Sequence, residues 1–287
     1  MFDDYAGDNP GIATAVLRGG EVVLRECHGL ADLESRTPVT PSTNFRLASV
    51  TKPFIAEAIG ILVNRGLLRY DDEVFGSATV RQLLTHTSAI VDYEDRIPPE
   101  RTEQVSDADV LRMLATTDRT GFHYSNSGYV LLGLLIERVS GQSLESFLRD
   151  EIFAKHGMHG TTVGPPAANR AYGYDRDDAR WVRRDQSVTS ATRGDGGMYS
   201  SIDDLSGWVA ALEDGVSHVD TDIPGVRYGL GWFYAENTIY HYGDTVSFRN
   251  AIVRWPAERL AVIVLTNRNE GDPVDLAKRV TEYYLNI

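Results

Sequence analysis

Residues 45–54 read Phe45-Arg46-Leu47-Ala48-Ser49-Val50-Thr51-Lys52-Pro53-Phe54, and a helical pattern follows at once. In that pattern the apolar positions from Phe54 to Val63 recur with the spacing of one helix face. Because proline is tolerated only near a helix start, Pro53 predicts a helix that begins close to Ser49. Residues three apart share a face of a helix, so Ser49 and Lys52 would hold a hydroxyl and an ammonium side by side.

This pair suggests nucleophilic chemistry. A serine hydroxyl is a weak nucleophile until a neighbouring base takes its proton. Lys52 can be that base, or it can lower the pKa of another base beside it. The Ser-x-x-Lys spacing also occurs by chance in many helices, so the pair alone does not define an active site.

Bulk composition narrows the possible partners. The chain has 287 residues and a net charge of −13, which opposes binding to nucleic acid or to anionic membrane surfaces. Cys27 is the single cysteine, which excludes an intrachain disulfide, and we expect it to be a packed core thiol. The acidic N-terminus has no apolar run of the kind that secretion signals need, and no stretch is long enough for a membrane span. We therefore expect a cytoplasmic protein.

Runs typical of β-strands lie at both ends of the chain. Residues 12–17 and 22–27 are joined by Gly19-Gly20, a signal for a two-residue hairpin. Four more runs cover residues 231–235, 238–241, 248–254 and 260–266, and Pro273 opens a last helix. The middle of the chain reads mainly helical, apart from a polar, irregular stretch at 165–190.

Strands at both ends with helices between them predict an α+β fold, in which an antiparallel sheet is flanked by helices and interrupted by a mainly helical insertion. We expect residues 1–48 and 225–287 to form the sheet subdomain. Residues 49–224 would form the helical subdomain, with the active site between the two.

Two further segments carry groups suited to catalysis. Tyr124 and Asn126 precede an apolar helix, where Tyr124 could serve as a general base if Lys52 favours its phenolate, and Asn126 could position either Lys52 or a substrate carbonyl. His241-Tyr242-Gly243 follows a strand, and a glycine there would let a substrate backbone approach closely. The backbone N–H after Gly243, together with that of Ser49, could hold an oxyanion.

Other motifs are absent or incomplete. Gly194-Asp195-Gly196-Gly197-Met198 fails as a dinucleotide fingerprint, because Tyr199 stands where the last glycine should be. The chain contains neither Gly-x-Ser-x-Gly nor His-Glu-x-x-His. The spacing of His156 and His159 allows weak metal ligation, but neighbouring glycines favour a turn. We expect no metal and no cofactor.

Taken together, the Ser-x-x-Lys, Tyr-x-Asn and His-x-Gly motifs resemble the serine β-lactamase and penicillin-binding-protein family. The similarity is greatest to the branch with class C β-lactamases, D-alanyl-D-alanine carboxypeptidases, D-aminopeptidases and related esterases. It runs nearly end to end and includes residues 10–12, 45–54, 66–74, 83–88, 124–129, 152–158 and 196–201. The resemblance implies the β-lactamase/transpeptidase-like fold.

The resemblance also implies roles for particular residues. Ser49 would be the acylated nucleophile and Lys52 its proton partner. Tyr124 would be the general base in acylation and would activate water in deacylation. Asn126 and His241 would orient the substrate, and the N–H groups of Ser49 and Asp244 would form the oxyanion hole. His86 and most of the Gly-Gly-Met loop would be structural.

Three positions depart from the family pattern. Asp244 brings a carboxylate to the expected oxyanion hole, where negative charge is unfavourable unless the side chain points outward or is paired. His241 replaces the lysine of typical class C β-lactamases, which argues against strong antibiotic hydrolysis. Ala89 replaces the usual glycine after Thr85-His86-Thr87-Ser88.

The expected function is a serine hydrolase that forms a covalent acyl-enzyme with a small ester or amide. A β-lactamase or D-alanyl-D-alanine carboxypeptidase is an alternative, and β-lactams are then possible substrates. A non-catalytic penicillin- or peptide-binding or sensing protein is the alternative of another class. Residues 89–122 and 160–192 would shape the substrate pockets, but their sequences do not identify the substrate. The oligomeric state is unknown.

Overall fold

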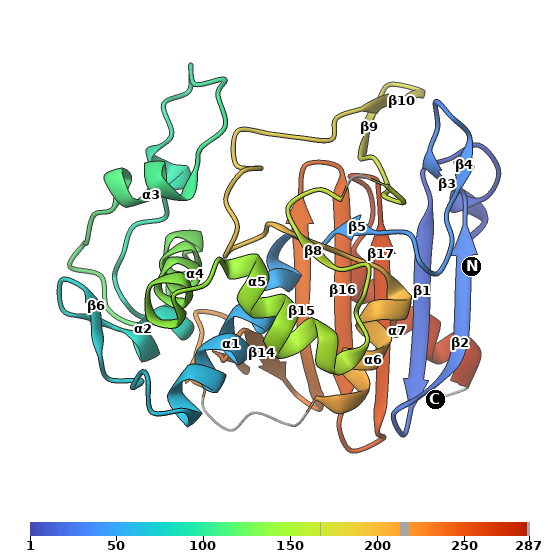
Figure 1. The fold of residues 1–287 in the computed structure, drawn as a ribbon. Helices are drawn as coiled ribbons and strands as arrows, with labels where there is room; N and C mark the ends of the chain where they lie inside the picture. The colour runs from blue at the N-terminus through green and yellow to red at the C-terminus, as the bar shows by residue number, and fades with distance from the viewer. Residues whose placement is uncertain (167, 213–217, 286–287) are drawn as a thin grey trace.

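In the computed structural model, described for residues 1–166, 168–212 and 218–285, strands from both ends of the chain form an eight-stranded antiparallel sheet (Figure 1). In spatial order the strands are β12 (Val219–Asp220), β13 (Val226–Gly229), β14 (Trp232–Ala235), β15 (Thr238–Thr245), β16 (Phe248–Trp255), β17 (Leu260–Thr266), β1 (Ile12–Arg18) and β2 (Glu21–His28). Most of the helices lie in the middle of the chain, between the strands of this sheet, so the predicted α+β fold is confirmed.

The α-helices are α1 (Lys52–Asn64), α2 (Val80–Leu84), α3 (Asp107–Met113), α4 (Asn126–Ser140), α5 (Leu144–Leu148), α6 (Ile202–Ala211) and α7 (Pro273–Leu285). The 3₁₀ turns are η1 (Asp3–Tyr5), η2 (Ala48–Thr51), η3 (Glu94–Arg96) and η5 (Ala154–His156), and η4 (Arg149–Phe153) is a π-helical turn. Short strands pair as β3 (Leu30–Asp32) with β4 (Thr37–Pro38), β6 (Glu73–Phe75) with β7 (Ala78–Thr79), β9 (Tyr174–Asp177) with β10 (Arg180–Arg183), and β11 (Met198–Ser200) with both β5 (Phe45–Arg46) and β8 (Thr162–Val163).

The large sheet is covered on both faces. Successive side chains of a strand point to opposite faces. In β17, Val262 packs with Leu276 of α7, whereas Ile263 belongs to the core that includes Leu205 of α6. Every residue of β17 is buried, in agreement with the apolar run from Leu260 to Leu265. Figure 1 shows α7 behind the sheet, with α1, α5 and α6 in front of it.

The predicted first hairpin is present. Gly19 and Gly20 both have positive φ, 64° and 88°, between β1 and β2. A two-residue turn with positive φ at both positions matches the twist of the strands, and glycine adopts it without steric cost. The stretch expected to be irregular, 165–190, contains the β9–β10 hairpin.

Candidate active site

Ser49 lies in the single turn η2, directly before α1. Helix α1 begins at Lys52 with Pro53 in its first turn, close to the predicted start. The residue before the nucleophile candidate, Ala48, has φ of +50°, a left-handed conformation that is uncommon for alanine. The backbone thus turns sharply where Ser49 projects from it, and such strain persists only where the surrounding structure holds it.

Lys52 is fully buried and lies at the centre of the site. Its Nζ donates hydrogen bonds, each 2.8 Å long, to Ser49 Oγ, Asn126 Oδ1 and the carbonyl oxygen of Asp195. Burial lowers the pKa of Lys52 to about 8, although nearby carboxylates led by Asp195 act in the opposite direction. A neutral, proton-accepting amine is therefore accessible close to neutral pH beside the Ser49 hydroxyl.

Tyr124 lies against Lys52, whose Nζ is 4.9 Å from the centre of the phenol ring. A hydrogen bond with Ser49 favours the phenolate, but burial outweighs it and raises the pKa of Tyr124 well above its usual value. The expectation that Lys52 favours the phenolate is therefore wrong in this structure. Burial of the phenol costs the anionic form more than the Ser49 hydrogen bond returns, and repulsion from Asp195 adds to that cost.

Asn126 opens α4 and connects Lys52 to a carboxylate. Its Oδ1 accepts from Lys52, and its Nδ2 donates to Glu94 Oε1 at 3.1 Å. Its backbone N–H donates to Asp92 Oδ2 at 2.7 Å. Because these contacts hold both ends of the amide, Asn126 positions Lys52, one of the two roles expected for it.

Both histidines of the motifs, His86 and His241, are buried. His86 is buried, and its Nδ1 accepts from the backbone N–H of Ser125, next to Tyr124. His241 is 1% exposed, with Nδ1 2.7 Å from the carbonyl oxygen of Tyr242 and Nε2 3.3 Å from Tyr228 Oη.

A carbonyl only accepts, so Nδ1 of His241 carries the proton and Nε2 accepts from Tyr228. Burial lowers the pKa of His241 to about 3, which keeps the ring neutral. The ring is buried among aromatic side chains that include Tyr228 and Phe233, and its expected contact with substrate stays a prediction.

Gly243 lies where strand β15 crosses the nucleophile turn. A Cβ at this position would be 2.0 Å from the carbonyl oxygen of Leu47 and 3.2 Å from the Cβ of Ala48. The sequence correctly marks a close backbone approach here, but the group that approaches is the protein's own chain. The expected approach of a substrate backbone to this strand stays a prediction.

The side chain of Asp244 points away from the nucleophile turn. Alternation along β15 puts its side chain on the face opposite to that of Gly243. It lies directly across from Arg249 on β16, and its Oδ1 is 2.6 Å from Arg249 Nη1. The Asp244 side chain is 58% exposed. The carboxylate is thus both outward and paired, the two conditions under which its charge is compatible with an oxyanion hole at the backbone.

A small pocket of about 40 Å³ lies beside Ser49. Its lining is polar and comes from several segments: Arg46, Ala48, Ser49, Tyr93, Glu94, Asn126, Thr189, Thr192, Asp195, Gly196, Asp244 and Thr245. The two stretches expected to shape the pockets both contribute to it. Neither Arg46 nor Glu94 was expected at the site, and most of the Gly196-Gly197-Met198 loop, next to Asp195, was expected to be structural. No local motif surrounds Glu94, and only the fold brings it to Ser49.

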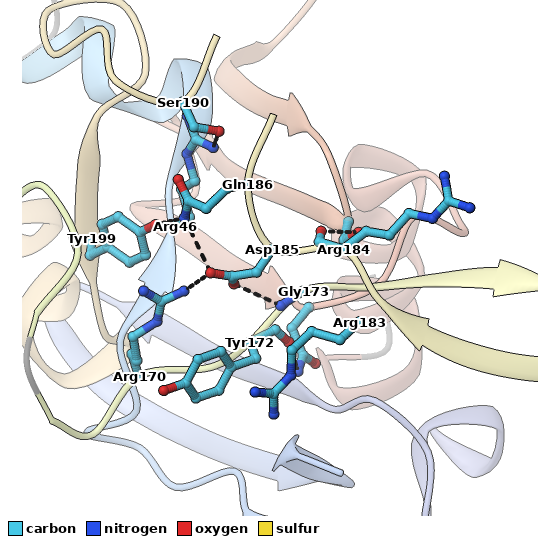
Figure 2. Close-up of polar contacts among 12 residues, drawn as sticks. Arg46, Arg170, Tyr172, Gly173, Arg183, Arg184, Asp185, Gln186, Ser190 and Tyr199 are labelled. Atoms are coloured by element: carbon cyan, nitrogen blue, oxygen red, sulfur yellow. Dashed lines mark hydrogen bonds and ion pairs between the residues drawn. The ribbon is translucent and has the colours of Figure 1, made fainter. Parts of the chain in front are cut away.

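Hydrogen bonds and an ion pair hold the side of the pocket that carries Thr189 and Thr192 against neighbouring segments. Figure 2 shows Asp185 paired with Arg170 and accepting from the backbone N–H of Gly173. Gln186 donates to Tyr199 Oη at 3.2 Å, and Arg46 Nη1 donates to Ser190 Oγ at 2.5 Å. These contacts hold residues 185–190 against β5 and β11 and so fix this side of the pocket.

Within the described ranges, no group of three or more His, Cys, Asp or Glu side chains is arranged to hold a metal ion. None of the described helices has the length and apolar character needed to cross a membrane.

The chain matches known proteins over nearly its whole length. The family model described as Beta-lactamase matches residues 2–284. Penicillin-binding protein 4* of Bacillus subtilis is 28% identical over 90% of this chain and 68% of its own length. A D-aminopeptidase of Brucella canis is 31% identical over 99% of this chain. The octameric penicillin-binding protein homologue of Pyrococcus abyssi superposes with a TM-score of 0.82 at 26% identity, over 96% of this chain and 74% of that one.

The relatives differ in length from this chain. It spans 61% of the Brucella canis D-aminopeptidase.

Proposed function

We propose that this chain, which belongs to the β-lactamase family of serine hydrolases, cleaves small amides or esters through a covalent acyl-enzyme on Ser49. The observation that carries the proposal is the 2.8 Å contact between Lys52 Nζ and Ser49 Oγ. A base at hydrogen-bond distance from a hydroxyl is the arrangement that activates serine.

In acylation, neutral Lys52 takes the proton from Ser49 as Oγ attacks the substrate carbonyl. The backbone N–H groups of Ser49 and Asp244 would stabilise the resulting oxyanion, because β14 pairs with β15 only as far as Tyr240 and leaves the strand edge beyond it open on that side. Tyr124 enters the step protonated, so it donates its proton to the leaving group and recovers one from Lys52. The bond from the carbonyl carbon to the leaving group then breaks, and the ester with Ser49 remains.

In deacylation, water attacks this ester and gives up its proton to neutral Lys52, and Ser49 Oγ then leaves with a proton from Lys52. The carboxylate of Asp244 does not oppose this step, because it is paired with Arg249 on the other face of the strand. A carboxylate directed at the oxyanion hole would favour a non-catalytic binding protein over an enzyme that turns over. The placement of Asp244 favours turnover.

The lining of the pocket beside Ser49 is polar, which suits a small polar substrate. The similarity to D-aminopeptidases supports amides of D-amino acids as the first class to test.

The test is a steady-state comparison of a p-nitrophenyl ester, D- and L-amino acid amides and a chromogenic cephalosporin, with Ser49→Ala as the matched control. We expect turnover of the ester and of at least one amide, with slow or no opening of the cephalosporin. All activity should be lost in Ser49→Ala. Cephalosporin as the best substrate would establish the β-lactamase alternative, and no turnover above the Ser49→Ala variant would contradict the proposal.

A further inference from the structure

We infer that Asp195 is the buried counter-ion that positions the Lys52 ammonium, and that the Tyr93 hydroxyl holds the Asp195 carboxylate in place. Both residues act on the reaction through Lys52, so they are positioning residues. The inference rests on the proposed acyl-enzyme function, because it concerns the base that activates Ser49.

Asp195 meets Lys52 through its backbone. The carbonyl oxygen of Asp195 accepts a 2.8 Å hydrogen bond from Lys52 Nζ, and both residues are buried. The side chain of Asp195 brings a carboxylate into the same interior, where charges interact more strongly than in water. Burial lowers the pKa of Lys52, and among the carboxylates that oppose this shift Asp195 acts most strongly. Asp195 therefore supplies the main opposite charge for a buried ammonium.

The Asp195 carboxylate is held by Tyr93. Tyr93 is 1% exposed, and its Oη donates to Asp195 Oδ2 at 3.0 Å. The backbone N–H of Tyr93 donates to Ser127 Oγ at 2.8 Å, which fixes this residue against α4. Burial raises the pKa of Asp195, whereas the Lys52 charge and hydrogen bonds from two hydroxyl groups, including that of Tyr93, lower it. Without the Tyr93 hydroxyl the carboxylate would bind a proton more readily, and the charge that faces Lys52 would be reduced.

The backbone around Asp195 is held by other contacts. Gly194 packs directly on α4, since a Cβ there would be 2.3 Å from the carbonyl oxygen of Tyr129. Arg193 forms ion pairs with carboxylates on both α3 and α4. Loss of the Tyr93 hydroxyl therefore leaves the backbone carbonyl in place and changes the ionisation of the Asp195 side chain.

Other titratable groups also face Lys52, and they are the carboxylates Asp92 and Glu94 near η3, the phenols Tyr124 and Tyr129, and the buried histidines His86 and His241. All of these side chains are retained when Tyr93 or Asp195 is substituted. A difference in pH profile between wild type and such a variant therefore reports the Asp195 charge.

The test is the pH profile of kcat/KM for an uncharged ester in wild type, Tyr93→Phe, Asp195→Asn and the double variant. We expect Asp195→Asn to lower the midpoint by about 1 pH unit, the effect of removing a nearby opposite charge. Tyr93→Phe should shift it in the same direction by less, and it should add no further shift to Asp195→Asn. Tyr174→Phe is the matched control. The hydroxyl of this buried tyrosine donates to Asp32 outside the pocket lining, so the variant should keep the wild-type midpoint.

The outcomes separate positioning from a merely structural contact, which would lower Tm or kcat and leave the midpoint unchanged. An unchanged midpoint in either folded variant, or a Tyr93→Phe shift that persists in the double variant, overturns the inference while the hydrolase proposal stands. If Tyr93→Phe does not fold, Asp195→Asn decides, because Tyr93 acts on Lys52 only through that carboxylate. If wild type shows neither ester turnover nor an adduct on Ser49, the hydrolase proposal itself fails.

Discussion

Lys52 Nζ lies 2.8 Å from Ser49 Oγ, on a side chain that has no exposed surface. The burial of Lys52 and its contact with Ser49 together determine whether Lys52 can act as a base. An exposed lysine has a pKa of about 10.4 and is a poor base at neutral pH, whereas burial lowers the pKa of Lys52 to about 8. The raised pKa of Tyr124 leaves Lys52 as the group able to accept the Ser49 proton.

This assignment predicts the pH dependence. Hydrolysis of an uncharged ester should rise with pH around a midpoint of about 8, because Lys52 accepts a proton only after losing its own. Lys52→Arg keeps the charge but not the basicity, and kcat/KM should fall by at least about 100-fold. The check is kcat/KM across the neutral to alkaline range. A profile without a step near the Lys52 pKa, or an active Lys52→Arg variant, would contradict the role of Lys52.

Gly243→Ala should damage both stability and activity. The new methyl group would be 2.0 Å from the carbonyl oxygen of Leu47, so β15 and the nucleophile turn must separate. We expect a loss of about 1–3 kcal/mol in unfolding free energy and a fall in acylation rate. Gly60→Ala in α1 is the matched control, since its Cβ would be 3.9 Å from Tyr70 Oη. Denaturant unfolding should show Gly60→Ala unchanged or more stable, and an equally stable Gly243→Ala would contradict the close approach.

What the sequence could predict depended on distance along the chain. Ser49 and Lys52 lie within one turn, and the Gly19-Gly20 hairpin is local, so pattern alone placed them. The contact of Lys52 with the Asp195 carbonyl spans 143 positions, and nothing near Asp195 signals it. The pKa of Tyr124 was predicted with the wrong sign, because its value depends on burial, which no motif reports. The face on which Asp244 lies required the register of β15.

Asp244→Asn should leave deacylation nearly unchanged. The carboxylate faces away from Ser49 and pairs with Arg249. The substitution therefore removes an ion pair at the surface, which contributes little to stability. Pre-steady-state kinetics with an ester would report acylation and deacylation separately. A several-fold faster deacylation in Asp244→Asn would show that the charge does reach the oxyanion hole.

Asp185→Ala should destabilise the side of the pocket formed by residues 185–190. The side chains of Asp185 and Arg170 are only 15% and 11% exposed, so removal of the carboxylate leaves a nearly buried guanidinium and the Gly173 N–H without their partner. Loss of one member of a buried pair costs about 3–5 kcal/mol. Thermal unfolding should show a large decrease in Tm. The exposed pair of Asp71 and Arg81 provides the control, because Asp71→Ala should change Tm far less.

The central claim is that Ser49 is an activated nucleophile, and intact-protein mass measures it most directly. Wild type and Ser49→Ala would be exposed briefly to a fluorophosphonate and, separately, to a small activated ester. We predict one stable phosphonyl adduct on wild type and a transient acyl adduct that decays as product is released, with neither adduct on Ser49→Ala. The absence of any adduct on wild type, or an equal adduct on Ser49→Ala, would contradict the claim.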